Sequence, residues 1–142
     1  MHVILHLLTT MQVLKVVIYN TKANFIVTGS KFISNCATAG GAIYNYGGEG
    51  FSVNNRTFIN NTASSACAIY SILVKLSVIN SRFINNSATL FSAGAVYNGD
   101  TNSTIINSTF KGNAANDNGD AVFNSENGLN VIIVQYLMFI PF

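Results

Sequence analysis

The chain has 142 residues, of which 7 are Lys or Arg and 5 are Asp or Glu, giving a net charge of +2. Only 8% of the chain is charged, where an ordinary soluble domain carries about 25%. Hydrophobic residues make up 49%, which is not the signature of intrinsic disorder, and the few scattered cations argue against binding to a phosphate backbone. Instead, 20 Asn, 13 Ser and 11 Thr supply most of the polar side chains.

Residues 1–17 form an apolar segment that polar residues interrupt, among them His6, Gln12 and Lys15. The segment has no basic start and no obvious small-residue cleavage site, so it is a poor signal peptide. It is also too interrupted for a good membrane span. We therefore expect it to be a degenerate coil of the repetitive structure that follows.

Residues 18–136 repeat with a period of 25–27 residues. Each copy carries Phe-x-x-Asn and then a second motif, which reads Gly-Gly-Ala-Ile-Tyr-Asn from Gly40 in the first copy. Two motifs that keep one period over four copies are a strong sign of a repeat architecture. The Phe-x-x-Asn pairs are Phe32 and Asn35, Phe58 and Asn61, Phe83 and Asn86, and Phe110 and Asn113; the second motif has Gly40, Gly41 and Ala42, then Ala68, Ala95 and Ala121.

Each copy contains short runs of β-branched and aromatic residues, separated by Gly, Asn and Asp, which favour turns. No stretch shows helical periodicity, and the Leu pattern of leucine-rich repeats is missing. The sequence therefore predicts an all-β fold, a parallel β-solenoid with one copy per coil and about four to five coils. We expect three short strands in each coil, stacked on their counterparts about 4.8 Å above and below.

Stacking predicts columns of equivalent residues. Like charges one coil apart repel each other, whereas aligned Asn side chains can hydrogen-bond along the column. We expect an amide ladder in the Phe-x-x-Asn column, a turn at a second Asn column, and three inward apolar columns. The second Asn column is Asn55, Asn80 and Asn107; the apolar columns are the four motif Phe residues, then Ile43, Ile69, Val96 and Val122, then Val27, Val53, Val78 and Ile105.

Residues 137–142 read Leu-Met-Phe-Ile-Pro-Phe and form an apolar tail. Solenoids need polar caps on their terminal coils, and neither end of the chain offers a polar helix or a charged edge. We therefore expect the chain to be part of a longer protein or to associate end to end.

The motifs also carry a family resemblance. Residues 40–43, Gly-Gly-Ala-Ile, together with Phe-x-x-Asn resemble the repeat of polymorphic outer membrane proteins, whose passenger regions are autotransported adhesins. The fuller pattern, with Asn-Ser-Thr-Phe at 107–110 and Asn-Asn-Thr-Ala at 60–63, is similar to adhesin-like surface proteins. The resemblance implies a right-handed parallel β-helix with an adhesive role and no catalytic residues. Only the first copy has both glycines, and Asp120 replaces the second in the last copy.

The aromatic residue of the second motif is the candidate binding position. Side chains alternate along a strand, so these rings point outward if the neighbouring Ile and Val point inward. An exposed aromatic column could bind sugars or a partner protein, or the rings could simply cover adjacent coils and stabilise the sheet. The column consists of Tyr44, Tyr70, Tyr97 and Phe123.

The acidic residues give little support to catalysis. Glycoside cleavage needs two carboxylates about 5–10 Å apart, and the chain offers five in total. Asp100 and Glu126 each stand five residues after the motif Ala, which predicts neighbouring positions in a solvated turn or, at most, a weak calcium contact. The other acids are Glu49, Asp117 and Asp120.

Other chemistry-bearing residues are few. Cys36 and Cys67 are too few for a zinc site, and we expect no metal or cofactor. The cations beside the motif Phe are expected to face solvent, and the five Asn-x-Ser/Thr sites are candidate glycosylation acceptors, some of them engaged in turns. The cations are Lys31, Arg56, Arg82 and Lys111; the acceptors are Asn55, Asn60, Asn85, Asn102 and Asn107.

The sequence thus favours a non-enzymatic fragment of an extracellular or cell-surface protein, associated with an outer membrane or cell wall. It would present a repetitive face to carbohydrate or protein, and no nucleic acid or membrane span is expected. The alternative is a degenerate carbohydrate-active β-helix, of the polysaccharide lyase or hydrolase kind, without an intact catalytic site.

Overall fold

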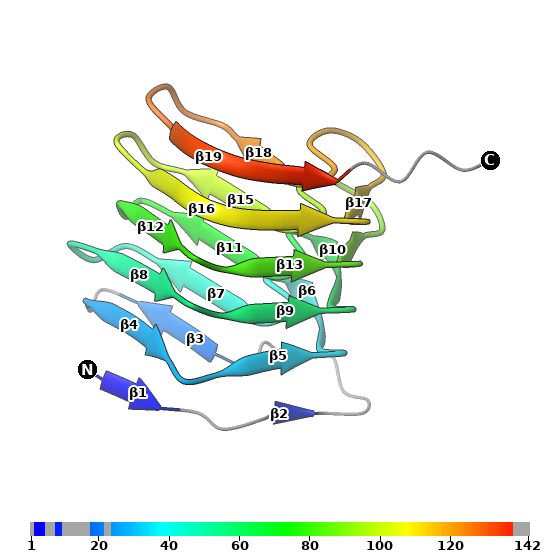
Figure 1. Ribbon diagram of the computed structural model, residues 1–142, viewed down its shortest axis with the longest axis horizontal. Coiled ribbons are helices and arrows are strands. Elements are labelled where there is room, and N and C mark those ends of the chain that lie inside the picture. Colours follow the sequence, from blue (N-terminus) through cyan, green and yellow to red (C-terminus); the bar gives the residue numbers. More distant parts are fainter. Residues whose placement is uncertain (1, 5–7, 10–17, 22–23, 138–142) are drawn as a thin grey trace.

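The computed structural model describes residues 2–4, 8–9, 18–21 and 24–137, and these residues form a parallel β-solenoid of about four turns (Figure 1). All strand pairings among them are parallel, and none of the described residues is helical. The predicted all-β solenoid is therefore confirmed. Much of the N-terminal segment 1–17 and of the C-terminal tail 137–142 lies outside the described residues.

The strands stack in four columns that form three sheets. The first column holds β1 (His2–Ile4), β4 (Phe25–Thr28), β8 (Phe51–Asn54), β12 (Leu76–Ile79) and the first half of β16 (Thr104–Lys111). The second holds β2 (Leu8–Thr9), β5 (Lys31–Ile33), β9 (Thr57–Ile59), β13 (Arg82–Ile84) and the second half of β16. The third holds β6 (Cys36–Ala39), β10 (Thr62–Ser65), β14 (Ser87–Ala88) and β17 (Ala114–Ala115). The fourth holds β3 (Ile18–Thr21), β7 (Ile43–Tyr46), β11 (Ile69–Ile72), β15 (Val96–Gly99) and β18 (Val122–Asn124), while β19 (Asn130–Leu137) pairs along β16.

A complete coil therefore has four strand segments, where the sequence predicted three. The first two columns form a single ten-stranded sheet because β16 runs unbroken through the corner between them. Each strand pairs with the equivalent segment of the next coil, so that Phe32 lies opposite Phe58 and Phe58 opposite Phe83. One sequence repeat is thus one coil.

Three corners in each coil are made by residues with left-handed backbone, at φ values between +45° and +70°. Such angles are unfavourable for most L-residues but are tolerated by Gly and Asn. The predicted turn at Asn55, Asn80 and Asn107 is confirmed as one of these corners. The three corner columns are Gly29, Asn55, Asn80 and Asn107; Ser34, Asn60, Asn85 and Gly112; and Gly40, Ala66, Ala93 and Gly119.

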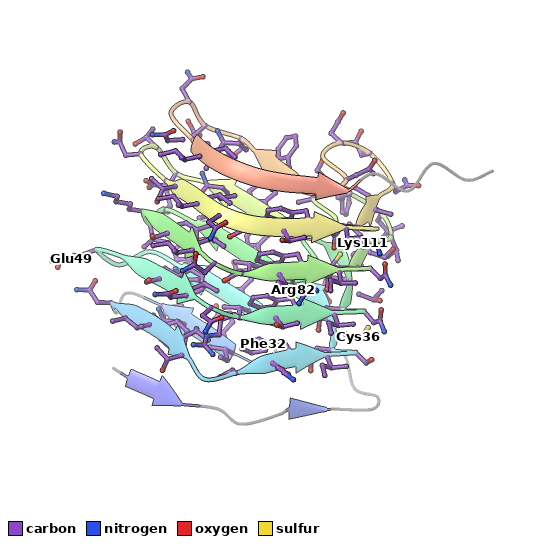
Figure 2. All side chains as sticks on the ribbon, viewed as in Figure 1. Phe32, Cys36, Glu49, Arg82 and Lys111 are labelled. Carbon is purple, nitrogen blue, oxygen red and sulfur yellow. The ribbon has the colours of Figure 1, made fainter. Side chains whose placement is uncertain are left out.

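The core lies between the columns, where side chains fill the interior of the coil (Figure 2). The motif Phe rings stack with centroids 4.8, 4.7 and 4.8 Å apart and planes within 5° of parallel. Both predicted Val and Ile columns are buried, apart from the half-buried Val122 in the last coil. A further buried column, which the sequence reading missed, consists of Phe25, Phe51, Leu76 and Ser103.

The predicted amide ladder is confirmed. Each Nδ2 donates to the Oδ1 of the next coil at 2.8 Å, from Asn35 to Asn61, from Asn61 to Asn86 and from Asn86 to Asn113. Each Oδ1 also accepts the backbone N–H of the Asn one coil before it, at 3.0–3.1 Å. Apart from the half-buried Asn113, the ladder is buried, so these bonds satisfy polar groups that water does not reach.

A second amide column runs beside the motif tyrosines and is interrupted. Asn20 donates to Asn45, and Asn98 donates to Asn124, both at 2.6 Å. Ser71 occupies the register position between Asn45 and Asn98 and is too short to reach either of them. Three buried polar atoms are therefore left without a hydrogen-bond partner: Asn45 Nδ2, Ser71 Oγ and Asn98 Oδ1.

We predict that Ser71→Asn stabilises the protein. An amide at this position can accept from Asn45 Nδ2 and donate to Asn98 Oδ1, with the same polarity as the rest of the column. Satisfying buried polar groups is worth about 1–2 kcal/mol in the free energy of unfolding. The urea midpoint should rise while the slope of the unfolding transition stays the same.

The control for this prediction is Ser52→Asn, the same chemical change at a half-buried outward position of β8. We expect the control to leave the midpoint unchanged. An unchanged or lowered midpoint for Ser71→Asn would show that the interruption costs the fold nothing.

Candidate binding face

The fourth strand column carries the predicted aromatic residues. Tyr44 pairs in register with Tyr70, Tyr70 with Tyr97, and Tyr97 with Phe123, and Tyr19 of β3 extends the row by one coil. Along β7, β11 and β15, buried residues alternate with these half-buried ones. The rings therefore lie on the outer side of the sheet, as the strand alternation predicts.

The rings stack on one another from coil to coil. Neighbouring centroids are 5.0, 5.1, 4.7 and 5.4 Å apart from Tyr19 to Phe123, with interplanar angles between 7° and 29°. Each inner ring is thus covered on both faces by its neighbours. A ligand that approaches from solvent meets ring edges and hydroxyl groups, rather than open ring faces on which a sugar could stack.

Tyr46 and Ile72 lie beside this row, two residues further along β7 and β11. Tyr46 is 39% exposed and Tyr19 is 67% exposed. The surface alternates phenol hydroxyls with apolar edges, which is the character of protein surfaces that bind amphipathic partners. We name as the tyrosine face the outward residues Tyr19, Tyr44, Tyr46, Tyr70, Ile72, Tyr97 and Phe123.

The stacking also affects the acidity of the face. Burial raises the pKa of Tyr44 and Tyr70 above 10.0, and the neighbouring tyrosines in and beside the column raise it further. Both effects disfavour the phenolate, so the hydroxyls remain hydrogen-bond donors at neutral pH.

Three of the five carboxylates accept hydrogen bonds from residues of their own turn or of the adjacent coil. Glu49, at the edge of the molecule in Figure 2, accepts a bond from Asn24 Nδ2 at 3.4 Å. Asp117 accepts from Ser92 Oγ at 3.2 Å, and Asp120 accepts from the backbone N–H of Ala115 at 3.0 Å. Within the described ranges, no three His, Cys, Asp or Glu side chains come together in a metal-binding group.

Asp100 and Glu126 follow the pairing of Asn98 with Asn124 by two residues. The register therefore places them one coil apart in the turn after the fourth column. Asp100 is half-buried and Glu126 is exposed.

Three of the four predicted solvent-facing cations, Lys31, Arg82 and Lys111, are exposed. Arg56 differs from the expectation, because it is half-buried and its Nε atom is buried without a hydrogen-bond partner. It stands at the corner between β8 and β9, where other coils place the buried serines Ser30, Ser81 and Ser108.

All five glycosylation acceptors are exposed and have left-handed backbone, with φ between +45° and +59°. They lie at turns, as expected for some of them, but none belongs to the buried amide ladder. The acceptors are Asn55, Asn60, Asn85, Asn102 and Asn107.

Comparisons with protein-family models, with curated proteins and with solved structures find no match to this chain. Among the residues that the structure describes, no helix is long and apolar enough to span a bilayer.

We predict that the protein loses stability at alkaline pH through the tyrosine face. Tyr44 and Tyr70 have a higher pKa in the folded state than the usual 10.0, so their contribution is complete below pH 10.0 and is lost as the pH rises through the folded pKa. Urea midpoints should fall over this range as tyrosinate absorbance appears. Tyr70→Phe should weaken the pH dependence, and an unaltered dependence in this variant would contradict the prediction.

We also predict that the two thiols react at very different rates. Cys36 is exposed, whereas Cys67 is buried and its pKa is raised to about 12, chiefly by burial. Because the thiolate is the reactive form, a thiol reagent should label one cysteine in the native protein and two in denaturant. Cys36→Ser should abolish the native reaction, and fast native labelling of this variant would show that Cys67 is accessible.

Proposed function

We propose that the chain is a non-enzymatic part of an extracellular or cell-surface, adhesin-like protein that presents a repetitive face to carbohydrate or protein. The observation that carries this proposal is the tyrosine face, in which aromatic residues occupy one outward register position from β3 to β18. Stacking on the next coil favours a ring at this outer position, as it does in the buried Phe column, but it does not require the hydroxyl groups that Tyr19, Tyr44, Tyr70 and Tyr97 carry.

The chemistry of the face suits weak contacts repeated along a polymer or an extended partner. Each tyrosine adds a hydroxyl and an apolar edge about 4.8 Å from the next one, which is the spacing of paired strands. Tyrosine has few rotatable bonds, and stacking restricts them further, so little conformational entropy is lost on binding. Repeated contacts of this kind gain affinity through their number.

The likeness of the motifs to polymorphic outer membrane proteins and other adhesin-like proteins supports a place at the cell surface, associated with an outer membrane or cell wall. The alternative, a degenerate carbohydrate-active solenoid, has weaker support. Glu49, Asp117 and Asp120 each form hydrogen bonds within or between turns, which is a structural use of a carboxylate. The predicted end-to-end association stays a prediction.

The test is an array of glycans and matrix proteins probed with the wild type and with the double variant Tyr70→Ala, Tyr97→Ala. We expect a signal for the wild type and a loss of about tenfold in affinity, equal to about 1.4 kcal/mol, for the variant. The matched control is Phe91→Ala, which removes an aromatic ring that is 58% exposed and lies outside the tyrosine face.

A second variant, Tyr70→Phe with Tyr97→Phe, keeps the ring stack and removes only the hydroxyls. It separates lost contacts from lost folding if the alanine variant unfolds. A wild type without any signal, or the same signal from all the tyrosine variants, would count against the proposal.

A further inference from the structure

A second surface feature lies at the corner between the first and second strand columns, on a different sheet from the tyrosine face. It is a groove of about 680 Å³. The corner residues Asn55, Asn80 and Asn107 stand one above the other along the solenoid axis. The groove is lined by Thr28, Asn54, Asn55, Arg56, Asn80 and Asn107, without a carboxylate.

Amide side chains give the groove both donors and acceptors. Asn80 and Asn107 are exposed and bonded to each other, from Asn107 Nδ2 to Asn80 Oδ1 at 2.8 Å. Each amide has a carbonyl oxygen and two N–H groups, so one such bond leaves other donors and acceptors for solvent or a ligand. Sugar hydroxyls, which both donate and accept, are complementary to such a surface.

Arg56 adds a positive charge at a position where the neighbouring coils have none. Ser30, Ser81 and Ser108 occupy this column, and each hydroxyl donates to a carbonyl two residues earlier, at 2.9–3.0 Å. In their place Arg56 has a buried Nε without a hydrogen-bond partner. No ion pair joins Arg56 to any described carboxylate.

The Nε is shielded from solvent, so a ligand reaches the guanidinium through its two Nη groups, which are not among the buried atoms and donate to none of the described residues. Hydrogen bonds from such a cation to an anion are stronger than those to a neutral acceptor. Burial also lowers the pKa of Arg56 below 12.5, which is the direction expected of a cation that lacks a partner. The guanidinium group matches carboxylate and sulfate oxygens because its N–H groups form a planar fork.

We propose that this groove binds an acidic oligosaccharide, with a carboxylate or sulfate group on Arg56 and the sugar hydroxyls on the amides of Asn55, Asn80 and Asn107. The proposal deepens the binding role proposed above, on which it rests, by naming a second site and a ligand class. The stacked amides favour a chain of sugars over a free anion, because they continue the polar surface past Arg56 into the following coils.

The experiment compares Arg56→Ser with Arg82→Thr by calorimetric or surface-based titration. Arg56→Ser restores the residue of the neighbouring coils, so it should fold. Arg82→Thr removes the same charge from an exposed position of β13, where the paired residues of the adjacent coils are Thr57 and Thr109. The protein is made in a host without N-glycosylation, because Asn55 and Asn107 are acceptor sites within the groove.

The probes are a heparin oligosaccharide, an oligogalacturonate and a neutral maltooligosaccharide of matched length, together with inorganic sulfate. We expect at least one acidic oligosaccharide to bind the wild type more tightly than the neutral one does. Arg56→Ser should weaken this binding about tenfold or more, and Arg82→Thr by less than about twofold. The comparison between heparin and oligogalacturonate identifies the anionic group.

Three outcomes would overturn the proposal. The two variants could weaken acidic oligosaccharide binding equally, which would indicate an effect of net charge alone. The neutral oligosaccharide could bind the wild type as tightly as the acidic ones, or inorganic sulfate could bind as tightly as the oligosaccharides. These outcomes are distinct from a failure of the general binding role. If the wild type gives no signal on the array, the binding role as a whole is contradicted. If the wild type gives a signal that Arg56→Ser leaves unchanged, only the proposed binding at the groove is contradicted.

Discussion

The parallel pairing of every strand with the same segment of the next coil is the constraint on which the rest of the structure depends. It places each side chain about 4.8 Å from its own equivalent, so a residue is selected for how well it packs on itself. Phenylalanine satisfies this condition by stacking and asparagine by hydrogen bonding from Nδ2 to Oδ1. A charged residue at such a position meets a like charge, and this accounts for a chain that is 8% charged.

Asparagine also serves a second purpose that stacking alone does not explain. Asn55, Asn80 and Asn107 form one left-handed corner, and Asn60 and Asn85 belong to another. At these positions the backbone conformation selects the residue, because Asn tolerates positive φ better than other side-chain-bearing residues. The amide content of the chain is therefore the sum of two requirements, one for a ladder inside the coil and one for bends between strands.

Much of the fold could be predicted from the sequence because the period is preserved in the residues that contact their own copies. Phe58 and Asn61 repeat in type and spacing, so their stacking could be inferred without coordinates. The fourth strand segment could not be predicted. It arises because the corner at Asn55 and Asn80 divides the first sheet into two strands per coil, whereas β16 passes the same corner at Asn107 without a break.

The sites were harder to predict because they depend on departures from the pattern. Ser71 interrupts an amide column and Arg56 interrupts a serine column, and each is recognisable only when the neighbouring coils are aligned around it. The tyrosine column was visible in the sequence, but the covering of its ring faces depends on ring orientation, which spacing does not determine.

The amide ladder gives the solenoid a direction. Along Asn35, Asn61 and Asn86, one side-chain N–H of each amide donates to the Oδ1 of the following coil, so the accepting oxygens face the preceding coil. The second N–H of Asn61 and of Asn86 donates back to a Phe carbonyl of the preceding coil. The column is therefore a row of parallel dipoles, and its two ends are chemically different. A coil added in the same orientation continues the row, whereas an inverted coil brings donor against donor or acceptor against acceptor. The polarity of the ladder is therefore compatible with a head-to-tail stack, the geometry of an open filament, and not with the two-fold symmetry of a closed dimer.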